Sequence, residues 1–260
     1  MAEPAPAVAP VGPMLFEQVR AELLKLLRSP IFSLFSLALP VIFYGFFGVG
    51  NADRLTNGVR GGTFLMASFA AYAVANVMLF TFGISIAVER GRRMDLLMRA
   101  TPLRGWVFLL SRIVAATCFA LAALLLLGVF ASLTGGVRLD AGRWAGLTVK
   151  LLLGSLPFLL LGFAIGYFVS PNSAPAVVNL IGLPMYFASG IFAPLQILPE
   201  FVQKVGPYLP AYLYGQVAWD AVGARSDPLW RDLVGLAIYT VAFLVLALLA
   251  FNRQENQRFS

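Results

Sequence analysis

The sequence contains no histidine, and this absence excludes several kinds of chemistry. Without an imidazole there is no Ser-His catalytic pair, no histidine metal ligand and no histidine proton relay. The one cysteine, Cys118, lies inside an apolar run, so an intrachain disulfide is excluded and the thiol reads as a small apolar residue. No G-x-x-x-x-G-K-[ST] phosphate loop is present either. We therefore expect no catalytic residue, no metal site and no cofactor in this chain.

Charge is also scarce. Only 12% of the residues are charged, against about 25% in a typical soluble domain, and the mean hydropathy is +0.83. Several apolar runs reach the roughly 20 residues that a helix needs to cross a bilayer. They are apolar all round, whereas barrel strands would alternate. The sequence predicts an all-α polytopic membrane protein, and in such a protein a net charge of +7 indicates basic loops rather than nucleic-acid binding.

The apolar runs predict six transmembrane helices in a single transmembrane domain. The predicted spans cover about residues 31–49, 62–88, 113–133, 147–169, 174–192 and 233–251. Residues 1–13 are rich in Pro and Ala and predict a disordered tail, so the domain would occupy residues 14–260.

Two apolar segments do not fit a span. Residues 14–29 alternate apolar and charged positions with helical spacing, with Leu26 on the apolar stripe and Glu22 mostly on the other side, which predicts an amphipathic helix in the membrane interface. The segment Gly206–Ala224 holds two prolines and Asp220, and after Pro210 it is too short to cross, so we expect a re-entrant segment.

Basic residues indicate the orientation. The loop 89–112 carries six arginines, and with the two termini its side of the membrane has eleven Lys and Arg against eight on the other. Because basic loops stay in the cytoplasm, we expect both termini there, in a bacterial inner membrane. The apolar residues of this loop, including Leu96 and Leu97, would form a short helix that ends at Thr101-Pro102.

Polar residues inside the spans are few. No Asp, Glu, Lys or Arg lies deep in a predicted span, which argues against a proton-driven carrier. Two polar stripes are candidates to line a permeation pathway: Ser68, Tyr72 and Asn76 in one, and Asn179, Tyr186 and Ser189 in the other. Hydrogen bonding between helices is the alternative interpretation, and it is favoured.

Three stretches resemble the type-2 ABC transporter permeases. They are "FEQVRAELLKLLRSPIFSLFSLALPVIF", "ERGRRMDLLMRATPL" and "ASGIFAPLQILPEFVQKVGPYLPAYLYGQVAW", and together they extend over nearly the whole chain. That family often has Gly-Thr where this chain has Arg93-Met94.

The resemblance implies a transport subunit, not itself an enzyme, of an exporter. Two copies of the chain would form the pathway, with membrane lipids as further partners, and a separate ATPase would hold ATP and Mg. The ATPase would dock on the loop through Glu89, Arg90, Arg92, Arg93, Asp95, Leu96, Leu97, Arg99, Thr101 and Pro102. A secondary transporter or channel, and a non-transporting assembly factor, remain as alternatives.

Overall fold

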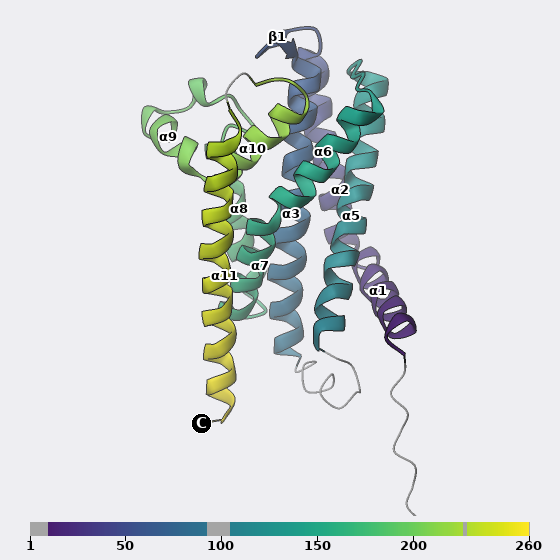
Figure 1. Cartoon of the computed structure of the whole chain (residues 1–260), viewed down its shortest axis with the longest axis vertical. Helices are drawn as coiled ribbons and strands as arrows, with labels where there is room; N and C mark the ends of the chain where they lie inside the picture. Colours follow the sequence, from purple (N-terminus) through teal and green to yellow (C-terminus); the bar gives the residue numbers. More distant parts are fainter. Residues whose placement is uncertain (1–9, 93–104, 226–227, 260) are drawn as a thin grey trace, which may run out of the picture.

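The computed structural model describes residues 10–92, 105–225 and 228–259, and among these the chain is a bundle of helices with one short hairpin (Figure 1). The helices are α1 (Val11–Leu27), α2 (Pro30–Phe43), α3 (Gly61–Gly91), α5 (Gly105–Thr134), α6 (Ala141–Gly154), α7 (Leu156–Phe168), α8 (Ala174–Ala188), α9 (Glu200–Val205), α10 (Pro210–Ala221) and α11 (Trp230–Phe259). The predicted all-α class is thereby confirmed.

The bundle has two distinct ends. Helix α1 begins and α11 ends at one of them, together with the end of α3 and the start of α5; we call this the terminal end (Figure 1). The opposite hairpin end carries the strands β1 (Leu55–Thr56) and β2 (Val59–Arg60), whose Asn57-Gly58 turn has two positive φ angles. Positive φ at both central residues is the mark of a type I′ hairpin turn.

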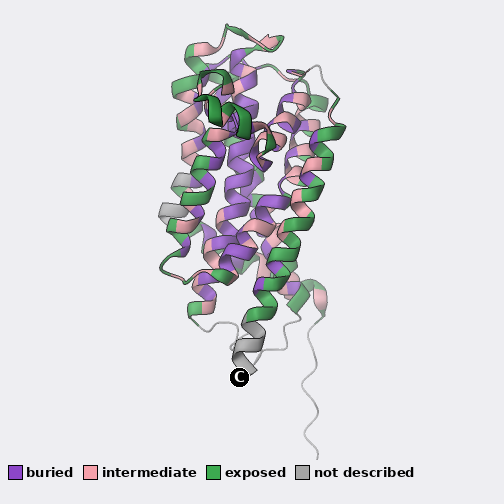
Figure 2. Cartoon of the chain, turned by 90° about the vertical axis from the view of Figure 1, so that its left-hand side faces the viewer, coloured by how far each residue is buried: buried purple, intermediate pink, exposed green. Residues whose placement is uncertain are grey.

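Helix α3 forms the centre of the bundle. Most of its residues are buried, and its 31 residues extend about 46 Å at 1.5 Å each. Figure 2 shows this buried column at the centre, whereas the helix that leads to the C-terminus is exposed along most of its length. Helices α2, α5, α7, α8 and α10 contact α3 directly.

Glycines bring α7 against the α3 backbone. A Cβ on Gly162 would lie 2.6 Å from the Leu79 carbonyl oxygen, and one on Gly166 would lie 2.9 Å from that of Phe82. Gly162 and Gly166 are four residues apart, so they share one helix face. This is the small-xxx-small arrangement that lets helix backbones approach closely in membranes.

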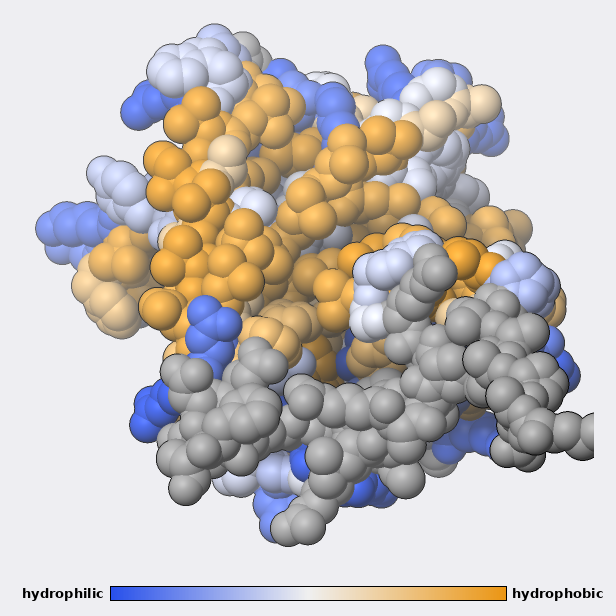
Figure 3. Space-filling view, turned by 60° about the horizontal axis from the view of Figure 1, so that its bottom comes forward, coloured by the Kyte–Doolittle hydropathy of each residue, from blue (hydrophilic) through white to orange (hydrophobic). Residues whose placement is uncertain are grey.

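Within the described residues, four helices are long and apolar enough to cross a bilayer by length and composition: Gly61–Gly91, Gly105–Thr134, Ala141–Phe168 and Trp230–Arg253. The apolar helices Ser36–Asn51 and Ala174–Ala188 are shorter, so the six-span count stays a prediction. The exposed flank of the bundle is correspondingly hydrophobic (Figure 3).

Several predicted boundaries differ from the observed helices. The run 31–49 is not one regular helix, because α2 passes into a π-helix at Tyr44–Gly48 and a 3-10 turn at Val49–Asn51. The run 147–169 starts earlier, at Ala141, since Asp140 caps that helix, and it breaks at Ser155. The run 174–192 ends at Ala188, after which Gly190 adopts φ +78°.

The segment predicted to be re-entrant, Gly206–Ala224, lies at the hairpin end and consists of a 3-10 turn at Gly206–Tyr208 followed by α10. Helix α10 has 12 residues and lies against α3, α6 and α11. Its Asp220 carboxylate is 2.6 Å from Lys150 Nζ of α6, and Trp219 Nε1 donates to Ser68 Oγ of α3 at 2.8 Å. Directional contacts to two helices therefore hold α10.

Candidate functional site

A group of four charged side chains lies at the terminal end, between α1, α3 and α5. Arg112 Nη2 of α5 is 2.6 Å from both carboxylate oxygens of Glu89 of α3, and 3.3 Å from Glu22 Oε1 of α1. Lys25 Nζ of α1 is 3.2 Å from Glu22 Oε2 and also contacts Glu89 Oε1. We call Glu22, Lys25, Glu89 and Arg112 the charge quartet. Two carboxylates and two cations make it neutral overall.

The charge quartet is largely withdrawn from solvent. The Arg112 side chain is 2% exposed, that of Glu22 6% and that of Glu89 11%, while Lys25 at 40% reaches the surface. The Arg112 guanidinium also lies over the Phe108 ring, 4.6 Å from its centroid. Buried charges are costly unless they are paired, and here each carboxylate contacts both cations.

The charge quartet is not among the sites that the sequence predicts. The predicted span 62–88 ends just before Glu89, and the predicted span 113–133 begins just after Arg112, so the prediction assigns both residues to the loop. In the structure α3 continues to Gly91 and α5 begins at Gly105, which places both inside helices. Glu22, which helical periodicity placed mostly on the polar side of α1, is buried. The pairings join residues 90 and 23 positions apart, which no local pattern can show.

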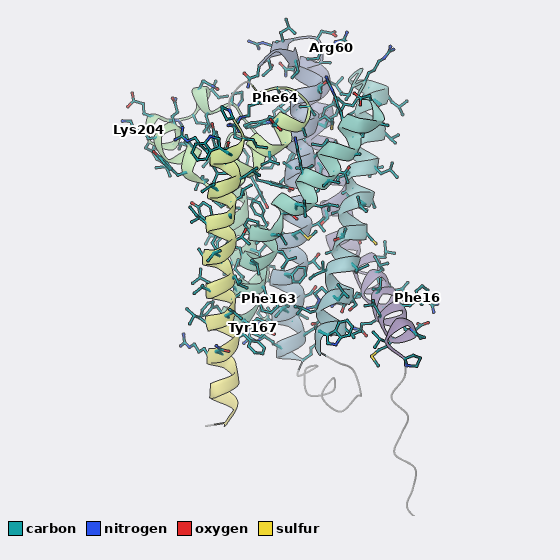
Figure 4. All side chains as sticks on the ribbon, viewed as in Figure 1. Phe16, Arg60, Phe64, Phe163, Tyr167 and Lys204 are labelled. Atoms are coloured by element: carbon teal, nitrogen blue, oxygen red, sulfur yellow. The ribbon has the colours of Figure 1, made fainter. Side chains whose placement is uncertain are left out.

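Arg90 is held on the opposite side of α3. Its Nη1 donates to the Gly166 carbonyl at 2.6 Å and approaches that of Val169 at 3.4 Å, and its guanidinium lies 5.5 Å from the centre of the Tyr167 ring. Those carbonyls are at the end of α7, where helix carbonyls lack intrahelical partners and a cation is favourable. Figure 4 shows Tyr167 near the terminal end of α7. Adjacent residues thus fix the end of α3 to α5 and α1 on one side and to α7 on the other.

The remaining residues of the candidate docking loop follow this fixed end. Arg92 is exposed at the end of α3. The other candidates lie outside the described residues: Arg93, Asp95, Leu96, Leu97, Arg99, Thr101 and Pro102. The side chains of Glu89 and Arg90 contact other helices of the same chain, so their geometry makes them supports for the loop.

The candidate pathway residues of α3 are buried within the chain. Ser68 donates to the Phe64 carbonyl at 3.1 Å and accepts from Trp219, while Tyr72 and Asn76 follow at one-turn spacing with little exposure. The Tyr72 ring packs edge-on against Tyr186 of α8 at 5.2 Å between centroids. The structure therefore brings the two stripes together at this pair of rings.

The stripe on α8 does not share one environment. Tyr186 and Ser189 are buried, and Ser189 Oγ donates to the Tyr186 carbonyl at 2.9 Å. The Tyr186 hydroxyl is buried without a hydrogen-bond partner among the described residues. Asn179 is half-buried and donates to the Pro175 carbonyl at 2.8 Å. Only Tyr186 and Ser189 therefore face the interior of the bundle.

The hairpin end carries separate polar contacts. Asp140 is exposed and accepts from the Arg143 backbone N–H at 3.0 Å, and this hydrogen bond lowers the pKa of its carboxyl. Arg225 pairs with Asp232 at 2.5 Å where the chain enters α11. Figure 4 marks Arg60 and Lys204 at this end, opposite Phe16 on α1. Polar side chains thus border the apolar flank at both ends.

Comparisons with known proteins agree with this architecture. Most of the chain, residues 53–249, matches the family described as ABC-2 family transporter protein. A protein of Bacillus subtilis (strain 168), whose name describes it as a transport permease, YvfS, is 28% identical over 243 residues, covering 93% of this chain and 98% of its own. The apolar helices and these matches make it a multi-pass membrane transport permease. The chain belongs to the ABC-2 transporter family.

Proposed function

We propose that this chain is the membrane-spanning permease subunit of an ATP-binding-cassette exporter, driven by a separate ATPase subunit. The observation that carries the proposal is the family match over residues 53–249, together with a transport permease relative aligned along almost its full length. The sequence has no phosphate-binding loop of its own, so ATP and Mg would be held by the partner. Hydrolysis there would drive the permease between closed and open states.

The terminal end is the proposed cytoplasmic face. Helix α1 begins and α11 ends there, and the arginine-rich loop leaves α3 at the same end (Figure 1). Retention of basic loops in the cytoplasm supports this orientation, with six spans in the bacterial inner membrane. Helix α1 would lie in the inner interface, and the segment Gly206–Ala224, which contains α10, would form the re-entrant element on the outer side.

The translocation pathway would form between two copies of the chain. Ser68, Tyr72, Asn76, Asn179, Tyr186 and Ser189 are the proposed lining residues. Because most of them are buried inside one protomer, they would reach a substrate only after α3 and α8 rearrange. The unpartnered Tyr186 hydroxyl supports this, since such a rearrangement would supply it with a partner.

The docking proposal is tested by purification of the complex. Arg93→Glu and Leu97→Asp should each weaken co-purification of the ATPase and leave membrane insertion intact. Arg138→Glu is the matched control, because Arg138 is an exposed arginine at the hairpin end. Wild-type recovery of the ATPase with both loop variants would show that the arginines serve only topology.

A further inference from the structure

The charge quartet is placed where the proposed docking loop is attached to the bundle. Glu89 lies two residues before the end of α3, and Arg112 lies seven residues after the start of α5. The two helices that bracket the loop are therefore joined to each other at these side chains. Lys25 and Glu22 extend the same contacts to α1, so three chain segments meet at one neutral group.

Stability alone is a weak explanation for such an arrangement. Removing two or more charges from water costs about as much as their attraction returns, and apolar side chains of similar volume often serve as well. Leu26, one turn along α1 from Glu22, is an apolar residue buried on the same face. What ionic contacts add is directional fixation, since charge-assisted hydrogen bonds specify the relative position of their partners.

Arg112 and Lys25 each connect helices through the two carboxylates of the charge quartet. Arg112 contacts both carboxylates, so it links α5 to α3 and to α1 through one nitrogen. Lys25 also contacts both carboxylates and closes the group from the α1 side. Loss of Arg112 would leave two carboxylates facing a single, partly exposed cation, and their repulsion would push α1 away from α3.

We propose that Arg112 is a positioning residue for energy coupling, which locks α1 to the two helices bracketing the docking loop so that they move as one body. The inference rests on the proposed function, because the displacement would come from ATP binding to the partner. Helix α1 would then follow the end of α3 and carry that displacement to α2, to which Ser33 Oγ connects it by a 2.6 Å bond to the Leu26 carbonyl.

The test measures the separation of α1 from the α7–α8 turn by pulsed electron paramagnetic resonance. Spin labels are placed at Arg20→Cys and Ser173→Cys, both exposed, in a Cys118→Ala background. The permease–ATPase complex is compared without nucleotide and trapped with ATP. The labelled chain is mixed with an excess of unlabelled Cys118→Ala chain, so that the measured distances lie within one protomer. In the wild type we expect one narrow distance population that shifts with ATP.

Arg112→Met should broaden that population without nucleotide and reduce the ATP-dependent shift at least twofold. Arg112→Lys keeps a cation facing both carboxylates and should restore part of the shift, which a loss of folding would not. Lys150→Met is the matched control, because it breaks a partly buried ion pair at the hairpin end. It should leave the distances unchanged.

The outcomes separate this inference from the proposed function. Failure of the wild-type chain to bind an ATPase would refute the proposed function, while broadening by Arg112→Met in the permease alone would still support the lock. If the distance distribution of Arg112→Met has the same width and the same ATP-dependent shift as that of the wild type, Arg112 does not lock α1 to α3 and α5, whatever the ATPase does. If Arg112→Met does not fold, Glu89→Gln and Glu22→Gln test the same contacts with smaller changes.

Discussion

The close approach of α7 to α3 makes Gly162 sensitive to substitution. A Cβ there would lie 2.6 Å from the Leu79 carbonyl oxygen, 3.1 Å from the Gly83 nitrogen and 3.2 Å from the Leu79 carbonyl carbon. All three are backbone atoms, so no side-chain rotation relieves the contact. Because carbon–oxygen contacts between helices settle near 3.3–3.6 Å, Gly162→Ala must separate the two helices by about 0.7 Å.

The expected cost follows from two opposing effects. Inserting a methyl group into a packed contact costs about 1–3 kcal/mol, whereas alanine favours the helix over glycine by about 0.8–1.0 kcal/mol. Gly146 of α6 supplies the matched control, because a Cβ there meets nothing within 4 Å. Both variants share the gain in helix propensity. The difference between them should therefore equal the steric cost, about 1–3 kcal/mol.

The measurement is unfolding in mixed detergent micelles with increasing SDS, followed by circular dichroism. Gly162→Ala should unfold at a lower SDS fraction than Gly146→Ala, with the free energies of unfolding differing by the amount above. Equal stability of the two variants would refute the close backbone contact between α7 and α3.

Three further predictions test other parts of the structure. In a Cys118→Ala background, Lys204→Cys should react with a membrane-impermeant maleimide in intact cells and Arg253→Cys should not, because α11 crosses the membrane between the two positions. Labelling at position 253 alone would show the opposite orientation. Trp219→Phe should lower the free energy of unfolding by about 0.6–2 kcal/mol, because it removes the hydrogen bond to Ser68. Adding Ser68→Ala should lower it little further, and additive losses in the double variant would argue against that hydrogen bond. Asp140→Ala should lower the melting temperature at neutral pH. Because the Asp140 pKa is lowered in the folded chain, the stability that its carboxylate contributes is lost as the pH falls through that pKa. The difference in melting temperature between wild type and variant should therefore shrink in acid. A difference that stays constant with pH would contradict the role of Asp140 as the cap of α6.

Composition and long apolar runs sufficed to predict the class of the protein. A chain with so little charge can bury its helices only in a bilayer or in one another, and α3 and α5 each contain one of the predicted runs. The ends were less accurate, because hydropathy stops at the first charge whereas a helix continues until its backbone is capped. Glu89 and Arg112 were misplaced for this reason. The break at Ser155 had a local signal that was overlooked, Gly154 with Pro157.

The contacts that matter most for the site lie beyond any local pattern. Arg112 was counted with the basic loop, yet it is buried because Glu22 and Glu89 come from two other helices. Lys150 of α6 likewise pairs with Asp220 of α10, 70 residues later. Periodicity describes one helix at a time, so it indicates which face is apolar but not which charges meet across helices.

The most direct test of the proposed function is ATP turnover in reconstituted membranes. The purified permease, a separate ABC ATPase from the same organism and the two together are placed in proteoliposomes at matched amounts. The account predicts no turnover by the permease alone, and a stable complex whose ATP hydrolysis differs from that of the free ATPase. Robust turnover by the permease alone, or an ATPase that neither binds it nor changes its rate, would contradict a permease driven by a separate subunit.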